Sequence, residues 1–285
     1  MKILITGASG FIGKNLIRYY LKENNDVTGI YRGKKPLISK SNHLKLIKAD
    51  LNNNKFILNF FFDVVIHCAA ETPVTSKNDN NLYRNNINSI KNLLKKTTFD
   101  KFFFLSTMSI YGKTSVKIVD EKTPPLNICM YGSSKLESEK LLKKYSNIAN
   151  SKCVSLRLPG VVGKGSHGNF ISEISKKMKK QQLINPKNPD SIFNNIVHVK
   201  KLFEFITKEI NFDKKNYYCV NIASHKKIKI KSILNFLKKN LNYKKNYNLI
   251  EDQKKSFIID ISKAREIGYK PWSVRQSLKN YIRNI

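Results

Sequence analysis

The start of the chain predicts a strand, a tight turn and a helix in immediate succession, and this feature restricts the fold most. Residues 2–6 read KILIT, an apolar run of strand-forming residues, and three glycines follow in the next seven positions. Glycine permits positive φ, lets the backbone approach a pyrophosphate and lets a helix pack closely against a strand. N–H groups at the N-terminus of the following helix favour phosphate. The pattern predicts a dinucleotide-binding turn, with contacts from Gly7, Ser9, Gly10, Phe11, Ile12 and Gly13.

Strand and helix patterns alternate along the first half of the chain. Apolar strand patterns cover residues 26–31, 44–49, 63–68 and 101–105, and a helical pattern covers residues 85–96. This alternation predicts an α/β fold with a doubly wound parallel sheet of the Rossmann type and right-handed crossovers. Ligands bind at the carboxyl ends of the strands in such sheets.

We expect two parts in the 285-residue chain. Residues 1–165 would form the Rossmann domain, and residues 166–285 would form a smaller C-terminal lobe that binds the substrate. Some segments of the lobe, such as residues 194–206, are expected to return to the Rossmann sheet. The hydrophobic content of 41% is sufficient for a core.

A tyrosine and a lysine four residues apart, Tyr131 and Lys135, lie where a second helical pattern begins. The spacing alone is weak evidence in a lysine-rich chain, since Tyr31 and Lys35 repeat it. Context separates the two pairs, because Tyr131 opens a helix expected over residues 133–144 and so shares one face with Lys135. A surface pair on an amphipathic helix is the alternative interpretation.

The chemistry of carbonyl reduction explains these residue types. Hydride reaches the carbon while a proton reaches the oxygen, and a phenol with an ordinary pKa of about 10 is a slow proton donor. The ammonium of Lys135 would stabilise the phenolate of Tyr131 and hold the ribose of a cofactor. Thr107, just after the strand pattern KFFFL, would donate a hydrogen bond to the developing oxyanion, with a helix cap or turn hydroxyl as the alternative role. We predict Thr107, Tyr131 and Lys135 as catalytic residues.

These segments resemble the extended short-chain dehydrogenase/reductase superfamily, and within it the NAD-dependent epimerase/dehydratase family, which acts on nucleotide-activated sugars. The resemblance runs nearly from end to end and rests on the order and spacing of many landmarks. Beyond the glycine turn they are Asp50-Leu51, His67-Cys68-Ala69-Ala70, Asn86, Thr107, Tyr131 with Lys135, Arg157-Leu158-Pro159-Gly160, Asn169-Phe170, Ile196-Val197-His198 and Arg265-Glu266-Ile267-Gly268.

The resemblance implies further site residues and an assembly. Further cofactor contacts are implied for Asp50, Leu51, Ala69, Ala70 and Pro159, with the first two at the adenine. Substrate contacts are implied for Thr72, Met108, Ser109, Asn169 and Phe170. A homodimer is also implied, formed through the helices expected over residues 85–96 and 133–144, and a role in surface-polysaccharide biosynthesis is typical of relatives.

Two departures from the family pattern narrow the chemistry. The 4,6-dehydratases carry an Asp and a Glu after the catalytic Ser or Thr, whereas this chain has Met108 and Ser109, so we expect no dehydration. The second strand ends in residues 31–35, YRGKK, without the carboxylate that holds the ribose 2′-hydroxyl in NAD enzymes. Arg32 and the lysines suit a 2′-phosphate, so NADP(H) is favoured over NAD(H), with a generally basic surface as the alternative.

The choice between NAD and NADP helps to distinguish an epimerase from a reductase. An epimerase retains NAD and restores it in each turnover, whereas a reductase takes NADPH from the pool and releases NADP. The sequence therefore predicts an NADPH-dependent reductase of a nucleotide-linked 4-keto sugar, in particular a 6-deoxy sugar. A nucleotide-sugar 4-epimerase with tightly bound NAD is the alternative, and the same catalytic residues serve both.

The formal net charge of +33 raises a third hypothesis, a non-enzymatic Rossmann protein that binds polyanions. The excess is mostly lysine, is spread along the chain and accompanies asparagine and isoleucine, which a bias toward AT-rich codons explains without a partner. The sequence contains no recognisable nucleic-acid-binding motif. We therefore expect no specific nucleic-acid partner.

The cysteines and histidines show no metal-ligand spacing, so we expect reduced thiols and no metal. The chain enters its first strand at once, which argues against a signal peptide. No apolar run reaches the about 20 residues that a membrane helix needs. The sequence therefore predicts a cytoplasmic protein without membrane insertion.

Overall fold

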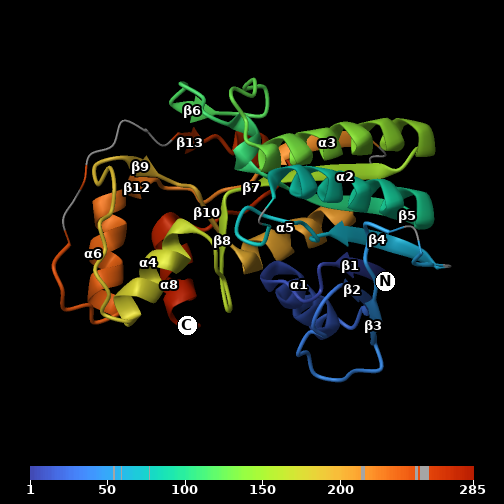
Figure 1. The fold of residues 1–285 in the computed structure, drawn as a ribbon, viewed down its shortest axis with the longest axis horizontal. Coiled ribbons are helices and arrows are strands. Elements are labelled where there is room, and N and C mark those ends of the chain that lie inside the picture. The colour runs from blue at the N-terminus through green and yellow to red at the C-terminus, as the bar shows by residue number, and fades with distance from the viewer. Residues whose placement is uncertain (54, 59, 77, 213–215, 248–249, 251–256) are drawn as a thin grey trace. The chain divides into compact units, whose positions relative to one another are not determined.

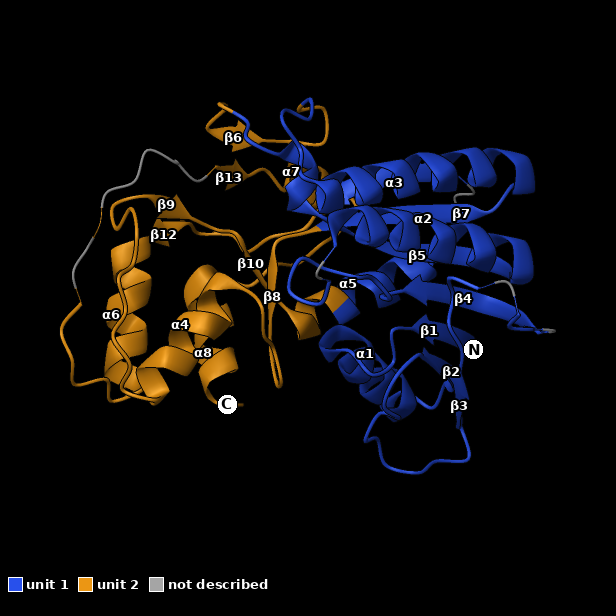
Figure 2. Cartoon of the chain, viewed as in Figure 1, with its two compact units in different colours: residues 1–114, 124–157, 203–220 blue, residues 115–123, 158–202, 221–285 orange. Residues whose placement is uncertain are grey.

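The computed structural model describes residues 1–53, 55–58, 60–76, 78–212, 216–247, 250 and 257–285. The chain divides into two compact units (Figures 1 and 2). Unit 1 comprises residues 1–114, 124–157 and 203–220, and unit 2 comprises residues 115–123, 158–202 and 221–285. Unit 1 thus takes in residues 203–220, beyond the expected boundary at residue 165.

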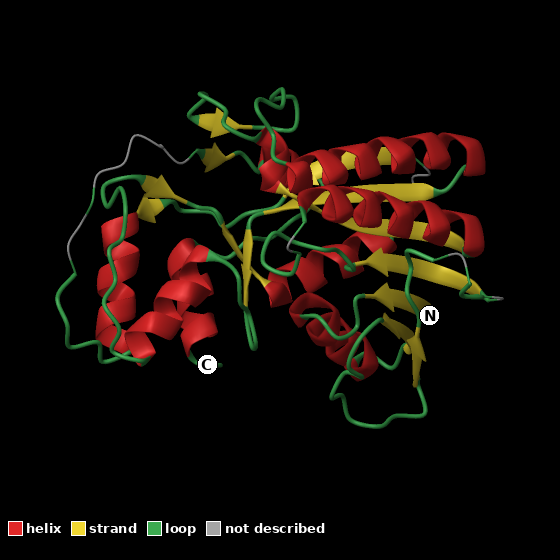
Figure 3. Cartoon of the chain, in the orientation of Figure 1, coloured by secondary structure: helices red, strands yellow, loops and turns green. Residues whose placement is uncertain are grey.

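A seven-stranded sheet is the centre of unit 1 (Figure 3). Its strand order is β11-β7-β5-β4-β1-β2-β3, and neighbours from β5 to β3 pair in parallel. Chain order runs outward from β1 on one side and from β4 on the other, which confirms the predicted doubly wound sheet. The strands are β1 (Lys2–Thr6), β2 (Asp26–Tyr31), β3 (Leu44–Lys48), β4 (Phe61–His67), β5 (Thr98–Thr107), β7 (Lys152–Leu158) and β11 (Tyr217–Asn221).

The helices of unit 1 connect these strands. α1 leads from β1 to β2 and α2 leads from β4 to β5, in opposite directions across the sheet, so right-handed crossovers place them on opposite faces. α2 packs beside α3 (Figure 1), and α1 packs against α5 through the rings of Tyr19 and Phe203. The helices are α1 (Phe11–Lys22), α2 (Asp79–Lys96), α3 (Met130–Ala149), α5 (Val199–Ile210) and the 3₁₀ helix η1 (Met108–Tyr111).

Apolar strand residues form the core of unit 1. Residues 3–5 of β1, 64–66 of β4 and 102–104 of β5 are all buried. A parallel sheet covered on both faces buries consecutive residues rather than alternate ones. This is why these strands read as continuous apolar runs in the sequence.

Three elements differ most from their predicted bounds. β5 runs to Thr107, so the predicted catalytic hydroxyl belongs to the strand itself. α2 begins at Asp79 rather than at residue 85, because the side chain of Asn78 accepts the N–H of Asn81 and caps it. α3 begins at Met130 rather than at residue 133, which places Tyr131 in its first turn.

Unit 2 is built from short sheets and helices around a separate core. β8 (Gly160–Val162) pairs in parallel with β10 (Ile196–His198), β9 (Ile192–Phe193) pairs antiparallel with β12 (Ile228–Lys229), and β6 (Ile118–Val119) pairs in parallel with β13 (Ile258–Ile259). The helices are α4 (Phe170–Lys179), α6 (Ile230–Asn240), α7 (Ser262–Glu266) and α8 (Val274–Ile282). α4, α6 and α8 contribute apolar side chains to one buried cluster.

Candidate active site

The glycine turn follows β1 and leaves no space for side chains. Gly7 has a φ of 68°, which residues with a side chain rarely adopt. A Cβ atom at Gly7 would lie 2.9 Å from the backbone nitrogen of Ala69, and one at Gly13 would overlap the carbonyl oxygen of Gly7. The turn is therefore held against the end of β4 on one side and against α1 on the other.

The N-terminus of α1 has the character of a phosphate site. Gly10 is its N-cap residue and supplies no capping side chain, and the first turn contains no acidic residue. A helix start of this kind directs its first N–H groups and the positive end of its dipole toward an anion. Ser9 and Gly10 are exposed, whereas Phe11 and Ile12 are half-buried. This cradle fits the pyrophosphate of a dinucleotide.

Thr6, the last residue of β1, ties the turn to the end of β4. Its hydroxyl shares a hydrogen bond of 2.8 Å with Nδ1 of His67 and accepts the N–H of Ala69 at 3.1 Å. The ring of His67 stacks on that of Phe104, and burial lowers its pKa to about 3. His67 is therefore neutral at physiological pH and fixes the backbone at Ala69, next to Ala70, where cofactor contacts are predicted.

Asp50 and Leu51 follow β3. Leu51 is buried, and its carbonyl oxygen accepts a hydrogen bond from Nδ2 of Asn92 at 2.9 Å. Oδ1 of Asp50 accepts the N–H of Asn52 at 3.0 Å and closes a turn. Both residues lie at the carboxyl end of a strand in the sheet, and their contact with an adenine stays a prediction.

Arg32 follows β2 and is paired with an acidic residue from another strand. Its Nη1 lies 2.9 Å from Oε1 of Glu71, which follows β4. The same oxygen accepts a hydrogen bond from Nδ2 of Asn85 at 3.0 Å. The guanidinium of Arg32, which the sequence predicts to bind a 2′-phosphate, is thus paired with a carboxylate.

Asn86 of α2 joins two parts of the site. Its side chain accepts the N–H of Glu71 at 2.8 Å and donates to the carbonyl oxygen of Glu71 and to Oγ of Ser134. Ser134 in turn donates to the carbonyl oxygen of Tyr131 at 2.8 Å. One buried amide therefore holds both the loop after β4 and the first turn of α3.

Tyr131 and Thr107 lie together in unit 1. Burial raises the pKa of Tyr131 to about 12, and the hydroxyl of Thr107 acts in the opposite direction with a smaller effect. Oγ1 of Thr107 accepts the N–H of Ser109 at 3.1 Å, so a residue of η1 fixes the position of the Thr107 hydroxyl. Tyr131 therefore keeps its proton at neutral pH.

Lys135 lies one turn along α3 from Tyr131 and is 2% exposed. Its Nζ donates to the carbonyl oxygen of Leu105 at 2.7 Å and lies 6.0 Å from the centre of the Tyr131 ring. Burial lowers the pKa of Lys135 to about 8, although the carboxylate of Glu139 acts in the opposite direction. Lys135 therefore remains mostly charged at pH 7 and places a positive charge beside the phenol.

A buried network connects β5, β7 and α3. Glu139, one turn beyond Lys135, accepts a hydrogen bond from Oγ of Ser106 at 2.5 Å and pairs with Arg157 at 2.8 Å. Arg157 also donates to the hydroxyl of Tyr111 at 3.1 Å. The side chains of Glu139 and Arg157 are 4% and 8% exposed, so water competes little with these bonds.

Gly132 allows α3 to approach η1 closely. A Cβ atom at Gly132 would overlap the carbonyl oxygen of Ser109. Met108 is buried and Ser109 is half-buried, so the residues after β5 pack against the first turn of α3. Thr72 is half-buried and its N–H donates to the hydroxyl of Thr75 at 2.8 Å. Contact of Thr72, Met108 and Ser109 with a substrate stays a prediction.

The remaining predicted residues belong to unit 2. Pro159 lies between β7 and β8. Asn169 is the N-cap of α4, because its Oδ1 accepts the N–H of Ser172 at 3.0 Å, and its Nδ2 donates to the carbonyl oxygen of Val161 at 3.0 Å. Phe170 begins α4 and is 37% exposed.

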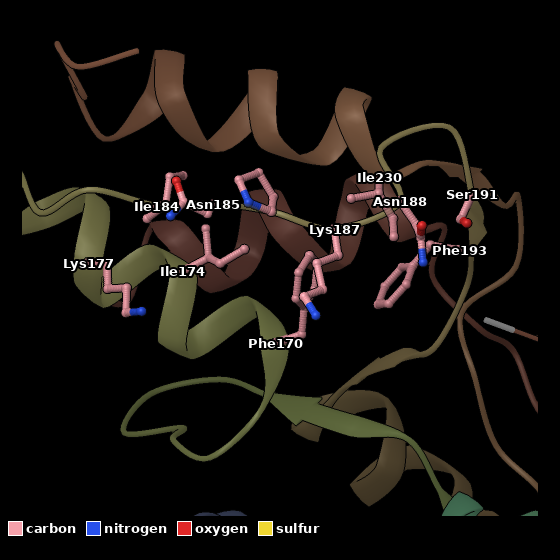
Figure 4. Close-up of a pocket in the computed structure, with 11 residues that line it drawn as sticks. Phe170, Ile174, Lys177, Ile184, Asn185, Lys187, Asn188, Ser191, Phe193 and Ile230 are labelled. Atoms are coloured by element: carbon pink, nitrogen blue, oxygen red, sulfur yellow. The ribbon is translucent and has the colours of Figure 1, made fainter. Parts of the chain in front are cut away.

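A cavity of about 450 Å³ lies beside Phe170 within unit 2 (Figure 4). α4 supplies Phe170, Ile174 and Lys177 to its wall, and Ile230 comes from the start of α6. An apolar wall with a few cationic groups suits a flat ring joined to an anion. The segment between α4 and β12 supplies the other lining residues, which are Ile184, Asn185, Pro186, Lys187, Asn188, Ser191 and Phe193.

The glycine turn and the Thr107–Tyr131–Lys135 site occur within a segment that matches a known family. The model of the NAD dependent epimerase/dehydratase family matches residues 3–206. The chain belongs to this family. The resemblance predicted from the sequence is thereby confirmed, and the chain is an enzyme of the epimerase/dehydratase family.

Individual members of the epimerase/dehydratase family show how far the likeness extends. A protein of Methanocaldococcus jannaschii provisionally named a UDP-glucose 4-epimerase is 26% identical over 94% of this chain and 93% of its own length. A GDP-6-deoxy-D-talose 4-dehydrogenase of Aggregatibacter actinomycetemcomitans is 32% identical over 67% of this chain and 64% of its own length. The structure of a UDP-glucuronic acid 4-epimerase from Bacillus cereus in complex with NAD matches with a TM-score of 0.84 and 26% identity, over 100% of this chain and 98% of that chain.

Two acidic residues near this candidate site are not among those predicted from the sequence. An acid was expected only at the end of β2, whereas Glu71 reaches Arg32 from the end of β4. The strand order β4-β1-β2 of a doubly wound sheet is the signal that could have found it. Glu139 follows Lys135 by four residues and therefore lies on the same face of α3.

Two further properties concern the described part of the chain. It contains no group of three or more His, Cys, Asp or Glu side chains that could hold a metal ion. None of its helices has the length and apolarity needed to cross a membrane.

Proposed function

We propose that this protein interconverts nucleotide sugars that differ in configuration at C4, with NAD as a retained cofactor. The arrangement of Tyr131, Lys135 and Thr107 supports proton exchange at C4, and the ion pair of Arg32 with Glu71 supports NAD as the cofactor. The side chains are a phenol, a buried ammonium whose charge favours the phenolate, and a hydroxyl that acts to lower the pKa of the phenol. Two of the relatives above are named 4-epimerases and the third a 4-dehydrogenase, so all three names place the chemistry at C4.

The side chains of the site would move one proton at the sugar O4. As a phenolate, Tyr131 would take this proton when the C4 alcohol is oxidised, and it would return the proton to O4 when the C4 carbonyl is reduced. The ammonium of Lys135 would stabilise the phenolate that starts and ends this cycle. Thr107 holds the same oxygen by a hydrogen bond. Bound NAD supplies the hydride acceptor and donor at C4, so no net oxidant is consumed.

The residues around the glycine turn fit NAD. The turn and the start of α1 would hold the pyrophosphate, Asp50 and Leu51 would meet the adenine, and Lys135 would hold the nicotinamide ribose. The charge of Arg32 is paired with Glu71 at 2.9 Å, which favours a ribose 2′-hydroxyl over a 2′-phosphate. This pairing supports NAD rather than NADP.

The cavity of unit 2 would take the nucleotide part of the substrate. The exposed ring of Phe170 offers a face on which a base can stack, and apolar side chains line much of the cavity beside it. Lys177 and Lys187 provide positive charge for a diphosphate.

An NADPH-dependent reductase of a nucleotide-linked 4-keto 6-deoxy sugar is the second candidate. Lys34 and Lys35 are exposed just beyond β2, where a 2′-phosphate would bind. The relative named a GDP-6-deoxy-D-talose 4-dehydrogenase is 32% identical. Both reactions need the same proton exchange at O4.

Analysis of the bound cofactor, followed by incubation with nucleotide sugars, distinguishes the two candidates. We expect denatured protein to release NAD, and native protein to convert UDP-glucose or UDP-glucuronic acid into its C4 epimer without added cofactor, as followed by NMR. Net oxidation of NADPH with a 4-keto nucleotide sugar would identify the reductase instead.

The Tyr131→Phe variant tests the proton transfer itself. Its kcat should fall by about a thousandfold, because the variant lacks the hydroxyl that exchanges the proton with O4. Tyr145→Phe removes a hydroxyl from the same helix and should retain wild-type activity. An unchanged kcat in Tyr131→Phe would disprove the assigned role.

A further inference from the structure

We propose that Glu71 sets the cofactor preference of the site for NAD over NADP by neutralising Arg32. This inference rests on the proposed dinucleotide site and deepens it. The preference would be decided by a residue that follows β4, although the adjacent segment after β2 contains only basic and neutral residues.

The strand order places the Arg32–Glu71 pair at the dinucleotide cradle. β1 lies between β4 and β2 in the sheet, and the pair joins the residues that follow these two outer strands. It therefore passes across the carboxyl end of β1, where the glycine turn begins at Gly7. The N–H of Ala8 donates to the carbonyl oxygen of Ile30 at 2.9 Å, which holds the end of β2 against the turn. The end of β2 is where such sheets receive the adenosine ribose.

Glu71 is the anchored member of the pair. Asn86 holds its backbone from both sides, accepting its N–H at 2.8 Å and donating to its carbonyl oxygen at 3.0 Å. Asn85 donates to its carboxylate at 3.0 Å. The side chain of Glu71 is 16% exposed and that of Arg32 is 56% exposed. The carboxylate is thus fixed by α2, and the guanidinium comes to it.

Charge explains the effect on the cofactor. A 2′-phosphate could reach Arg32 through the N–H groups that Glu71 does not use, but the carboxylate offsets the positive charge of the guanidinium. The carboxylate would then remain near a group that carries about two negative charges, which repel it. A ribose 2′-hydroxyl is neutral, leaves the ion pair intact and can donate a hydrogen bond to the carboxylate.

Titration of nucleotide-free protein with NADH and NADPH tests the inference. We expect wild-type protein to bind NADH at least about tenfold more tightly than NADPH. Glu71→Gln keeps an oxygen that can accept from Asn85 but removes the charge, so the ratio should shift toward NADPH by about tenfold or more. Adding Arg32→Met to Glu71→Gln should abolish this gain, since the gain depends on the released guanidinium.

Glu137→Gln is the matched control, because Glu137 is a more exposed carboxylate of α3 that pairs with Lys140. It should leave the ratio unchanged. An unchanged ratio in Glu71→Gln, a wild-type preference for NADPH, or binding of neither cofactor would each overturn the inference. The titration measures binding alone, so protein that prefers NADH but does not convert nucleotide sugars would disprove the proposed function and leave the role of Glu71 standing.

Discussion

Each of the two units is stabilised internally by a different kind of contact. In unit 1, Glu139 of α3 and Arg157 of β7 form an ion pair whose side chains are 4% and 8% exposed. In unit 2, Asp190 pairs with Lys229 and Lys231 at the surface, and the interior contains an apolar cluster. Buried charges tolerate few arrangements, whereas an apolar wall accepts ligands of similar shape. If the proposed function is correct, we expect the site of unit 1 to tolerate fewer substitutions than the cavity of unit 2.

The largest effect on stability is expected when the buried ion pair of unit 1 loses one of its two residues. Arg157→Met leaves Glu139 buried without its partner and should lower the free energy of unfolding by about 3–5 kcal/mol, measured by urea denaturation. The double variant Arg157→Met/Glu139→Gln should recover much of this loss because it leaves no unpaired charge.

The matched change in unit 2 is Asp190→Asn, which removes the partner of two exposed lysines. Exposed pairs of this kind contribute little, so the urea midpoint should remain at the wild-type value. Equal losses in Arg157→Met and Asp190→Asn would contradict the contrast between the units.

The second largest effect is expected on kcat as the pH rises and Lys135 loses its charge. Burial lowers the pKa of Lys135 to about 8. The charged form stabilises the phenolate, so kcat should be level below pH 8 and fall above it, to about a tenth of its plateau one unit higher. His67 does not contribute in this range, because its pKa is lowered to about 3.

Glu139 raises the pKa of Lys135, so Glu139→Gln should move the fall in kcat to lower pH. Asp190→Asn should leave the profile in place and serves as the control. A profile that stays level through pH 9.5 would show that the charge of Lys135 is not required.

How much the sequence could predict depends on whether a feature is local. The glycine turn, the apolar strands and the Tyr131–Lys135 spacing are short patterns, and each sets its geometry through neighbouring residues. The pairs Arg32–Glu71 and Arg157–Glu139 join residues that are 39 and 18 positions apart. Nothing in the sequence around Arg32 shows which carboxylate will meet it, because that depends on strand order.

Helix starts show the same limit. The repeat of apolar residues predicted that α2 begins at residue 85. In the structure it begins at Asp79, after the cap at Asn78. The cap satisfies backbone N–H groups and needs no apolar face. Periodicity detects the packed part of a helix and misses a polar first turn.

The smallest effect is expected at a helix cap of unit 2, and it tests whether Asn169 also contacts the substrate. Asn169→Ala and Ser273→Ala each remove a capping box, from α4 and α8, so each should lower the free energy of unfolding by about 1 kcal/mol. The amide nitrogen of Asn169 carries two hydrogens, and the bond to Val161 uses one of them. If the second serves the nucleotide sugar, Asn169→Ala should raise KM severalfold while Ser273→Ala leaves it unchanged. Equal KM values would assign Asn169 to the helix alone and would leave selectivity to the cavity beside Phe170.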